Sequence, residues 1–191
     1  MLVSAHMDFV EKARIMDGPR INRALARLSS EIVEENHGAG DLFLVGIRRR
    51  GVPLAQRLAT KIASLENLQV PVGILDINLY RDDLTTVGVQ PVLNNTEIDF
   101  SVTGKDIILF DDVLYTGRTI RSALDAVIDF GRPRSIQLIV LVDRGHRELP
   151  IKADYVGKNL PTSRRQSVQV RLQEIDGEDE VLLDDAPEEG A

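Results

Sequence analysis

Cysteine is absent from the sequence, and so is any apolar run long enough to span a membrane. Without cysteine there is no disulfide framework and no thiolate metal site, which suits a reducing cytoplasm. A spanning helix needs about 20 consecutive apolar residues. The N-terminus also lacks the basic and then apolar segments of a secretion signal. We therefore expect a cytoplasmic protein with no membrane partner.

The chain has 191 residues, of which 43% are hydrophobic and 28% charged, as expected for one globular domain. Its net charge of −7 disfavours non-specific binding to nucleic acid. Nine of the 30 acidic residues lie between 174 and 189, so the rest of the chain is slightly positive and RNA binding is permitted. We expect a mobile N-terminal arm over residues 1–16, a domain over 17–176, and an acidic, frayed tail over 177–191.

Strand and helix patterns alternate along the chain. Apolar runs at 42–47, 72–79, 107–110 and 135–142 indicate strands buried on both faces. Apolar residues at helical spacing indicate helices over 19–36, over 52–65, and between Thr119 and Gly131. Alternation over 168–172 indicates a half-exposed strand. This order predicts an α/β fold with a central twisted parallel sheet, flanked by helices, and with sites at the carboxyl ends of its strands.

The segment from 106 to 131 carries the clearest chemical signal. Its strand ends at Asp111 and Asp112, and a loop leads into the next helix. The loop consists of Val113, Leu114, Tyr115, Thr116, Gly117, Arg118 and Thr119. Loop amides and a helix N-terminus make an anion site, to which the threonine hydroxyls and Arg118 add donors. A phosphate beside vicinal hydroxyls, as in ribose 5-phosphate, would satisfy both the amides and the carboxylates.

A solvated sheet edge, a different type of phosphate loop and an acidic receiver-type pocket fit this segment less well. Two acids alone would favour a solvated edge, but the threonine-rich turn behind them makes that interpretation improbable. Neither G-x-x-x-x-G-K-[ST] nor a G-x-G-x-x-G after a strand is present. A receiver-type pocket also uses paired aspartates, but it would not need the turn.

A second basic loop follows the first predicted strand. Arg48, Arg49, Arg50 and Gly51 stand at its carboxyl end, where they describe another anion site. A solvated basic turn is the alternative. Arg23 and Arg27 fall on the polar side of the first helix, and their spacing alone favours a solvated face.

FDDVLYTGRT, at 110–119, resembles the phosphoribosyl pyrophosphate (PRPP) motif of type I phosphoribosyltransferases. Three further segments resemble the PyrR family, whose members regulate pyrimidine operons and are also uracil phosphoribosyltransferases. They are VGIRRRG at 45–51, DINLYRDDL at 76–84 and VDRGHRELPIKADYVGKNLPTS at 142–163. Together they cover about residues 17–176. The resemblance implies the type I phosphoribosyltransferase fold with a small hood.

The resemblance also implies the reaction, in which uracil and PRPP give UMP and pyrophosphate. Asp111 and Asp112 would hold the ribose hydroxyls and stabilise the developing positive charge. Arg81, on a flexible loop within the polar stretch from 80 to 99, would join the 48–51 loop at the pyrophosphate. Mg²⁺ would bind through substrate oxygens near the two acids, without direct protein ligands.

For the base, the resemblance implies Lys152 at a carbonyl, Tyr155 stacked on the ring and the Val156 backbone at its edge. A surface lysine and packed core residues are the alternative. Purine-salvage relatives carry an acidic residue where this chain has Tyr115, which argues against a purine.

A second role, implied only by the resemblance, is binding of a pyr operon mRNA leader, promoted by UMP or UTP. The RNA-binding residues would be Arg23, Arg27, Arg144, His146 and Arg147, across a homodimer or larger oligomer. Three other functions stay open: the transferase without RNA regulation, an RNA-binding regulator that has kept only the fold, and a transferase for another base.

Overall fold

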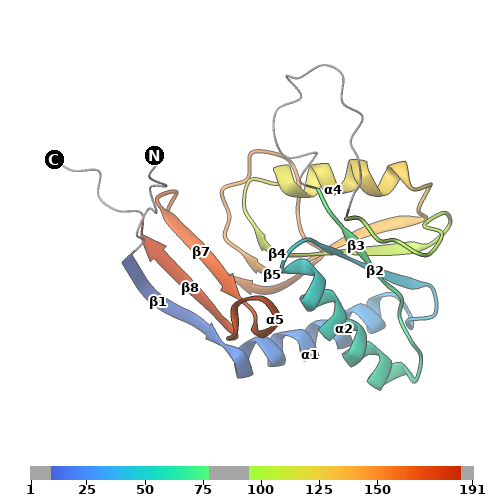
Figure 1. Ribbon diagram of the computed structural model, residues 1–191, viewed down its shortest axis with the longest axis horizontal. Coiled ribbons are helices and arrows are strands. Elements are labelled where there is room, and N and C mark those ends of the chain that lie inside the picture. The colour runs from blue at the N-terminus through green and yellow to red at the C-terminus, as the bar shows by residue number, and fades with distance from the viewer. Residues whose placement is uncertain (1–9, 78–94, 186–191) are drawn as a thin grey trace, which may run out of the picture.

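A computed structural model describes residues 10–77 and 95–185 of the chain (Figure 1). The elements in chain order are β1 (Val10–Asp17), α1 (Gly18–Glu35), β2 (Leu42–Ile47), α2 (Gly51–Glu66), β3 (Val72–Leu75), β4 (Asp106–Leu114), α4 (Arg118–Asp129), β5 (Ser135–Asp143), β6 (Tyr155–Asn159), β7 (Gln166–Arg171), α5 (Gln173–Asp176) and β8 (Glu180–Asp185). None of the helices in these two stretches is both long and apolar enough to cross a membrane.

Five strands form a parallel sheet in the order β3-β2-β4-β5-β6. Along the central strand β4, Ile107 and Leu109 belong to an apolar cluster that includes α4. Ile108 and Phe110 belong to a second cluster, built with α1 and α2. Both faces of the strand are therefore covered, which is why its apolar run is continuous. The predicted α/β fold with a central parallel sheet is confirmed.

The predicted helices are confirmed to within a few residues. Asp17 caps α1 by accepting a hydrogen bond from the Arg20 amide at 2.9 Å, and Pro19 lies in the first turn. That turn tolerates proline because its amides have no partner within the helix. The β3 strand is shorter than predicted and ends at Leu75. By contrast, β4 is longer, so that Asp111 and Asp112 lie in its second half rather than beyond its end.

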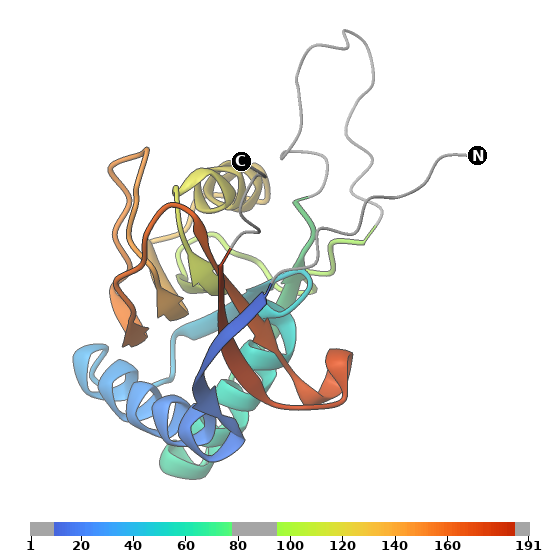
Figure 2. The same ribbon diagram turned by 90° about the vertical axis from the view of Figure 1, so that its left-hand side faces the viewer.

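A second, antiparallel sheet has the order β1-β8-β7, and we call it, together with α5, the hood. It stands beside the parallel sheet, and Figure 2 views the molecule from the hood side. The half-exposed strand predicted over 168–172 corresponds to β7. The other two strands, β1 and β8, come from the two ends of the chain.

The hood corrects the expected domain limits. Residues from Val10 form strand β1 rather than a mobile arm, and Glu180–Asp185 form strand β8 rather than a frayed tail. Val181 and Leu182 of β8 are buried. Glu180 is also buried, and its charge is balanced by Arg14 and Arg171 at 3.0 and 2.9 Å. Apolar burial and ion pairing thus make an acidic segment into an ordered strand.

Candidate active site

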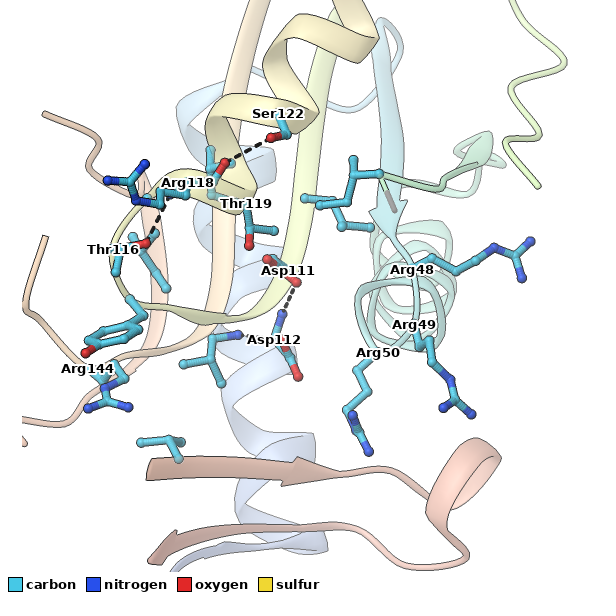
Figure 3. Close-up of a pocket in the computed structure, with 18 of the residues that line it drawn as sticks. Arg48, Arg49, Arg50, Asp111, Asp112, Thr116, Arg118, Thr119, Ser122 and Arg144 are labelled. Atoms are coloured by element: carbon cyan, nitrogen blue, oxygen red, sulfur yellow. Dashed lines mark hydrogen bonds between the residues drawn. The ribbon is translucent and has the colours of Figure 1, made fainter. Parts of the chain in front are cut away.

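One pocket of about 710 Å³ opens at the carboxyl ends of β2 and β4 and faces the hood strands, which Figure 3 shows at its lower edge. It brings together the two loops that the sequence singles out. Its lining includes Arg48, Arg49, Arg50, Asp111, Asp112 and all seven residues of the 113–119 loop. The carboxyl ends of neighbouring parallel strands meet at one edge of a sheet, which explains why these segments converge.

The two acids stand at the centre of the pocket, where the backbone orients them. The Asp112 amide donates to the Asp111 carboxylate at 3.0 Å, and the Val113 amide donates to the Asp112 carboxylate at 2.8 Å. Burial raises the pKa of the Asp112 carboxyl, although the Val113 amide and the charge of Arg50 act in the opposite direction. Asp112 therefore takes up a proton at a higher pH than a free aspartate does.

The 113–119 loop is anchored as a turn at the start of α4. Gly117 has φ of 93°, in the left-handed region that favours glycine, and it directly precedes α4. The Thr116 carbonyl accepts hydrogen bonds from the Glu148 and Leu149 amides at 2.9 and 3.2 Å. On the solvent side, Arg118 pairs with Glu148 at 2.6 Å. An anchored turn at the N-terminus of a 12-residue helix is a favourable place for a phosphate.

The arginine loop lies against the strand that carries the acids. A Cβ atom at Gly51 would overlap the backbone oxygen of Phe110, which directly precedes Asp111, so only glycine permits this approach. The peptide bond between Arg48 and Arg49 is cis. Arg50 forms two hydrogen bonds to Asp176 of α5, at 2.8 and 3.2 Å. Three arginines therefore stand across the pocket from the acids (Figure 3). Arg81, which we expected to join them, lies outside the described residues.

The residues expected to bind the base do not line this pocket. Tyr155 is 2% exposed, and its hydroxyl lies 3.1 Å from Asn36 and 3.3 Å from Gln137. Burial raises its pKa to about 12. The expected stacking role of Tyr155 is therefore wrong, because the ring is a core residue beside α1. Lys152 is exposed, and Val156 packs partly buried against the α4 side of the sheet.

In their place, the pocket wall is completed by Tyr115, Arg144 and two residues of the hood, Ser167 and Val168. The alternation in β7 predicted a strand there, but nothing in the sequence placed that strand over the acids. Sequence reasoning missed these two hood residues, and it also did not single out Ile47, Ile77, Ile120 and Ser122, which line the pocket as well.

The five residues expected to bind RNA are separated in the structure. Arg23 and Arg27 line a second, shallower pocket of about 410 Å³ between α1 and β6, together with Arg20 and Lys158. Arg27 donates to the Val156 and Gly157 carbonyls at 3.1 and 2.7 Å. These arginines thus border a basic surface on α1.

The other three follow β5. Arg147 pairs with Asp143 at 2.5 Å and donates to the Tyr115 and Ile151 carbonyls, both at 2.9 Å. His146 lies 2.5 Å from the Thr162 carbonyl. Arg144 is buried and turns into the main pocket, so the expectation that it belongs to an RNA surface is wrong for the single chain.

Comparisons with known proteins agree with this geometry. The family model "Phosphoribosyl transferase domain" matches residues 12–175. The chain is 65% identical to the "Bifunctional protein PyrR" of Pelotomaculum thermopropionicum over 173 residues, which is 91% of this chain and 96% of that protein. It is 62% identical to the protein of the same name from Thermus aquaticus, over 90% of this chain and 95% of the other.

Solved structures share the fold at low identity. The hypoxanthine phosphoribosyltransferase of Trypanosoma cruzi matches with a TM-score of 0.71 and 17% identity, over 92% of this chain and 98% of that one. A hypoxanthine phosphoribosyltransferase of Staphylococcus aureus matches with a TM-score of 0.68 and 21% identity, over 95% and 96% of the two chains.

Proposed function

The chain belongs to the phosphoribosyl transferase family and, within it, to the bifunctional PyrR proteins, and from this membership we propose how its surfaces serve two functions. It is a uracil phosphoribosyltransferase, converting uracil and PRPP to UMP and pyrophosphate. It is also a regulator that binds the mRNA of a pyrimidine operon. The observation that carries the enzymatic role is the pocket in which two fixed carboxylates lie between a phosphate loop and an arginine loop.

PRPP fits this pocket group by group. Its 5-phosphate would take the amides of the 113–119 loop, with the Thr116 and Thr119 hydroxyls beside them. Its ribose hydroxyls would donate to Asp111 and Asp112, and its pyrophosphate would lie toward Arg48, Arg49 and Arg50. Arg81 would complete this last subsite. Each group of PRPP would thus meet backbone or side-chain groups of complementary charge or hydrogen-bonding character.

The reaction moves charge in two directions. A ring nitrogen of uracil forms a bond to C1 of the ribose while the bond from C1 to the pyrophosphate oxygen breaks. Positive charge grows on the sugar, where Asp111 and Asp112 stabilise it, and negative charge grows on the pyrophosphate, where the arginines do. Groups that are fixed before the reaction stabilise such charges without reorganising.

Mg²⁺ suits the same place. The cation prefers oxygen ligands and keeps several waters, and the pocket sets two carboxylates beside the pyrophosphate subsite. When bound with PRPP, it would neutralise part of the charge on the leaving group. Asp111 and Asp112 are the residues that would lie nearest to it.

The transferase role is tested by incubating the protein with uracil, PRPP and Mg²⁺ and measuring UMP. Asp112→Asn keeps the shape of the side chain but removes its charge, and we expect the rate to fall about 10²–10³-fold. Asp125→Asn, on the exposed side of α4, is the matched control and keeps the wild-type rate. No UMP from the wild type, or full activity in Asp112→Asn, would refute the assignment. Competition by cytosine and hypoxanthine separates uracil from another base.

RNA regulation is proposed to use the basic surface on α1 together with His146 and Arg147 after β5. The bound RNA would be the leader of its own pyrimidine operon, in the cytoplasm, with UMP or UTP strengthening the complex. A homodimer or larger homo-oligomer would unite the two basic regions. Support comes from Arg23 and Arg27, which gather near Lys158 on one surface.

Gel shifts against that leader, with and without UMP, test this role. Arg23→Gln should weaken binding and reduce the salt dependence by about one unit of slope, as expected for one lost phosphate contact. Arg121→Gln on exposed α4 serves as the control. Arg23 is a cleaner probe than Arg147, whose replacement would also break the contacts to Asp143 and Tyr115. An RNA affinity that changes neither with UMP nor in Arg23→Gln would count against this role and leave a transferase without RNA regulation.

A further inference from the structure

Arg144 is buried, and among the described residues no carboxylate pairs with its charge. Its side chain lines the main pocket, yet the residue is only 6% exposed. One guanidinium nitrogen donates to the Ser163 carbonyl at 3.1 Å, and within the described residues the Nε atom has no hydrogen-bond partner. Arg147, three positions further on, is paired with Asp143. Because an unpaired buried charge costs free energy, such a group in a pocket points to a ligand that completes it.

The guanidinium group is held in place by stacking. Its central carbon lies 4.0 Å from the centre of the Tyr115 ring, close enough for a cation–π contact. Tyr115 in turn meets the His146 ring edge-on, with 6.2 Å between the ring centres. The hydrogen bond from the guanidinium group to the Ser163 carbonyl also holds the side chain in place. Arg144 is thus positioned before any ligand arrives, as a recognition residue requires.

Its place in the pocket is opposite the arginine loop. Figure 3 shows Arg48, Arg49 and Arg50 on one side of Asp111 and Asp112, and Arg144 on the other. In the transfer reaction, the incoming nitrogen and the leaving pyrophosphate occupy opposite faces of the sugar carbon. If pyrophosphate lies toward the arginine loop, the base enters on the side of Tyr115, Arg144 and the hood residues Ser167 and Val168.

We propose that Arg144 recognises the pyrimidine ring, donating to the carbonyl oxygen at C4 and balancing the negative charge that the ring carries when its reacting nitrogen loses its proton. This inference rests on the proposed transferase function. The proton passes to solvent water, the bond from nitrogen to C1 forms, and the bond from C1 to pyrophosphate breaks. Cytosine carries an amine where uracil has a carbonyl, so two donors would face each other there. Arg144 therefore selects uracil over cytosine.

Binding measurements separate this inference from the function on which it rests. Calorimetry on the full chain, with UMP, CMP and ribose 5-phosphate, should show UMP binding roughly tenfold or more tightly than CMP, since one buried donor is left unpaired with CMP. Arg144→Gln should remove that preference and leave ribose 5-phosphate binding unchanged. Arg144→Lys keeps the charge but loses the planar guanidinium group that stacks on Tyr115, and should keep only part of the preference. Arg121→Gln is the control.

The pH profile of UMP synthesis gives a readout that a merely structural role would not move. Without the guanidinium, deprotonated uracil is less favoured, so in Arg144→Gln the rising limb should move about one unit toward higher pH. Equal binding of UMP and CMP by the wild type would overturn the inference without any variant. So would an unchanged UMP preference in Arg144→Gln, and loss of RNA binding alone would return Arg144 to the RNA surface. Failure to bind ribose 5-phosphate at all would instead refute the proposed function.

Discussion

The parallel sheet and the hood form two walls of one pocket, but they are held together by different forces. Ile107, Ile108, Leu109 and Phe110 of β4 are fully buried between helices on both faces. The hood also buries apolar residues, yet α5 and the turn after it are attached to α2 largely through charge. Arg57 of α2 binds Glu174 at 2.6 Å and Asp179 at 2.8 Å, while Arg50 binds Asp176 at 2.8 Å.

This difference has a consequence for function. The sheet edge carries the acids and the phosphate loop, so the PRPP side of the pocket stands on a rigid apolar framework. The hood supplies Ser167 and Val168 on the side where we place the base. Salt and pH should therefore affect the base side of the pocket more than the PRPP side, because screening weakens ion pairs and not apolar packing.

The largest difference should appear when the apolar packing of the sheet and the ion pairs of the hood are disrupted in separate variants. Leu109→Ala in the sheet should lower the free energy of unfolding by about 2–5 kcal/mol at any salt concentration, because it leaves a cavity. Arg57→Met keeps the apolar stem but loses hydrogen bonds to two carboxylates, and should cost about 1–2 kcal/mol after allowance for solvent screening. Urea unfolding at low salt and at about 1 M salt measures both.

Two results would contradict this comparison. One is an Arg57→Met protein as stable as the wild type at low salt, which would mean that apolar contacts alone dock the hood. The other is a cost for Arg57→Met that does not decline in high salt. Arg121→Met, on the exposed face of α4, should stay within about 0.5 kcal/mol of the wild type and controls for the loss of a charge.

The same contrast explains how far the sequence alone leads. Apolar runs predicted β2, β4 and β5, because strands covered on both faces leave that pattern wherever they occur. The acids and the arginine loop could be placed together because adjacent parallel strands end at one sheet edge. In this part of the chain, the local sequence pattern is enough to indicate where a segment lies in the fold.

Alternation indicated β7, but β1 and β8 of the hood could not be predicted in this way, because these strands are made by contacts between distant residues. In the sequence, Glu180 is one residue of an acidic run. Only the folded chain brings Arg14 and Arg171 next to it. Tyr155 illustrates a second limit. It lies beside Ile139 in the register of β5 and β6, and so shares the face covered by α1, whereas a shift by one position would have turned it the other way.

The smallest effect we expect is a response of the hood to acid. The hydrogen bond from Arg57 lowers the pKa of Glu174. For Asp179, burial acts to raise the pKa, but hydrogen bonds from Arg57 and the Gln173 amide outweigh it and the pKa is lowered. A carboxyl whose pKa is lower in the folded than in the unfolded chain stabilises the fold fully above its unfolded pKa, about 4, and progressively less as the pH falls through the folded pKa.

Hydrogen exchange, expressed as protection relative to the unfolded chain, should thus show the β7 and β8 amides losing protection between about pH 5 and pH 3 while those of β4 keep theirs. In Arg57→Met the hood should be less protected at pH 6 and change little on acidification. Equal losses in hood and sheet would mean that the two walls of the pocket open as one unit.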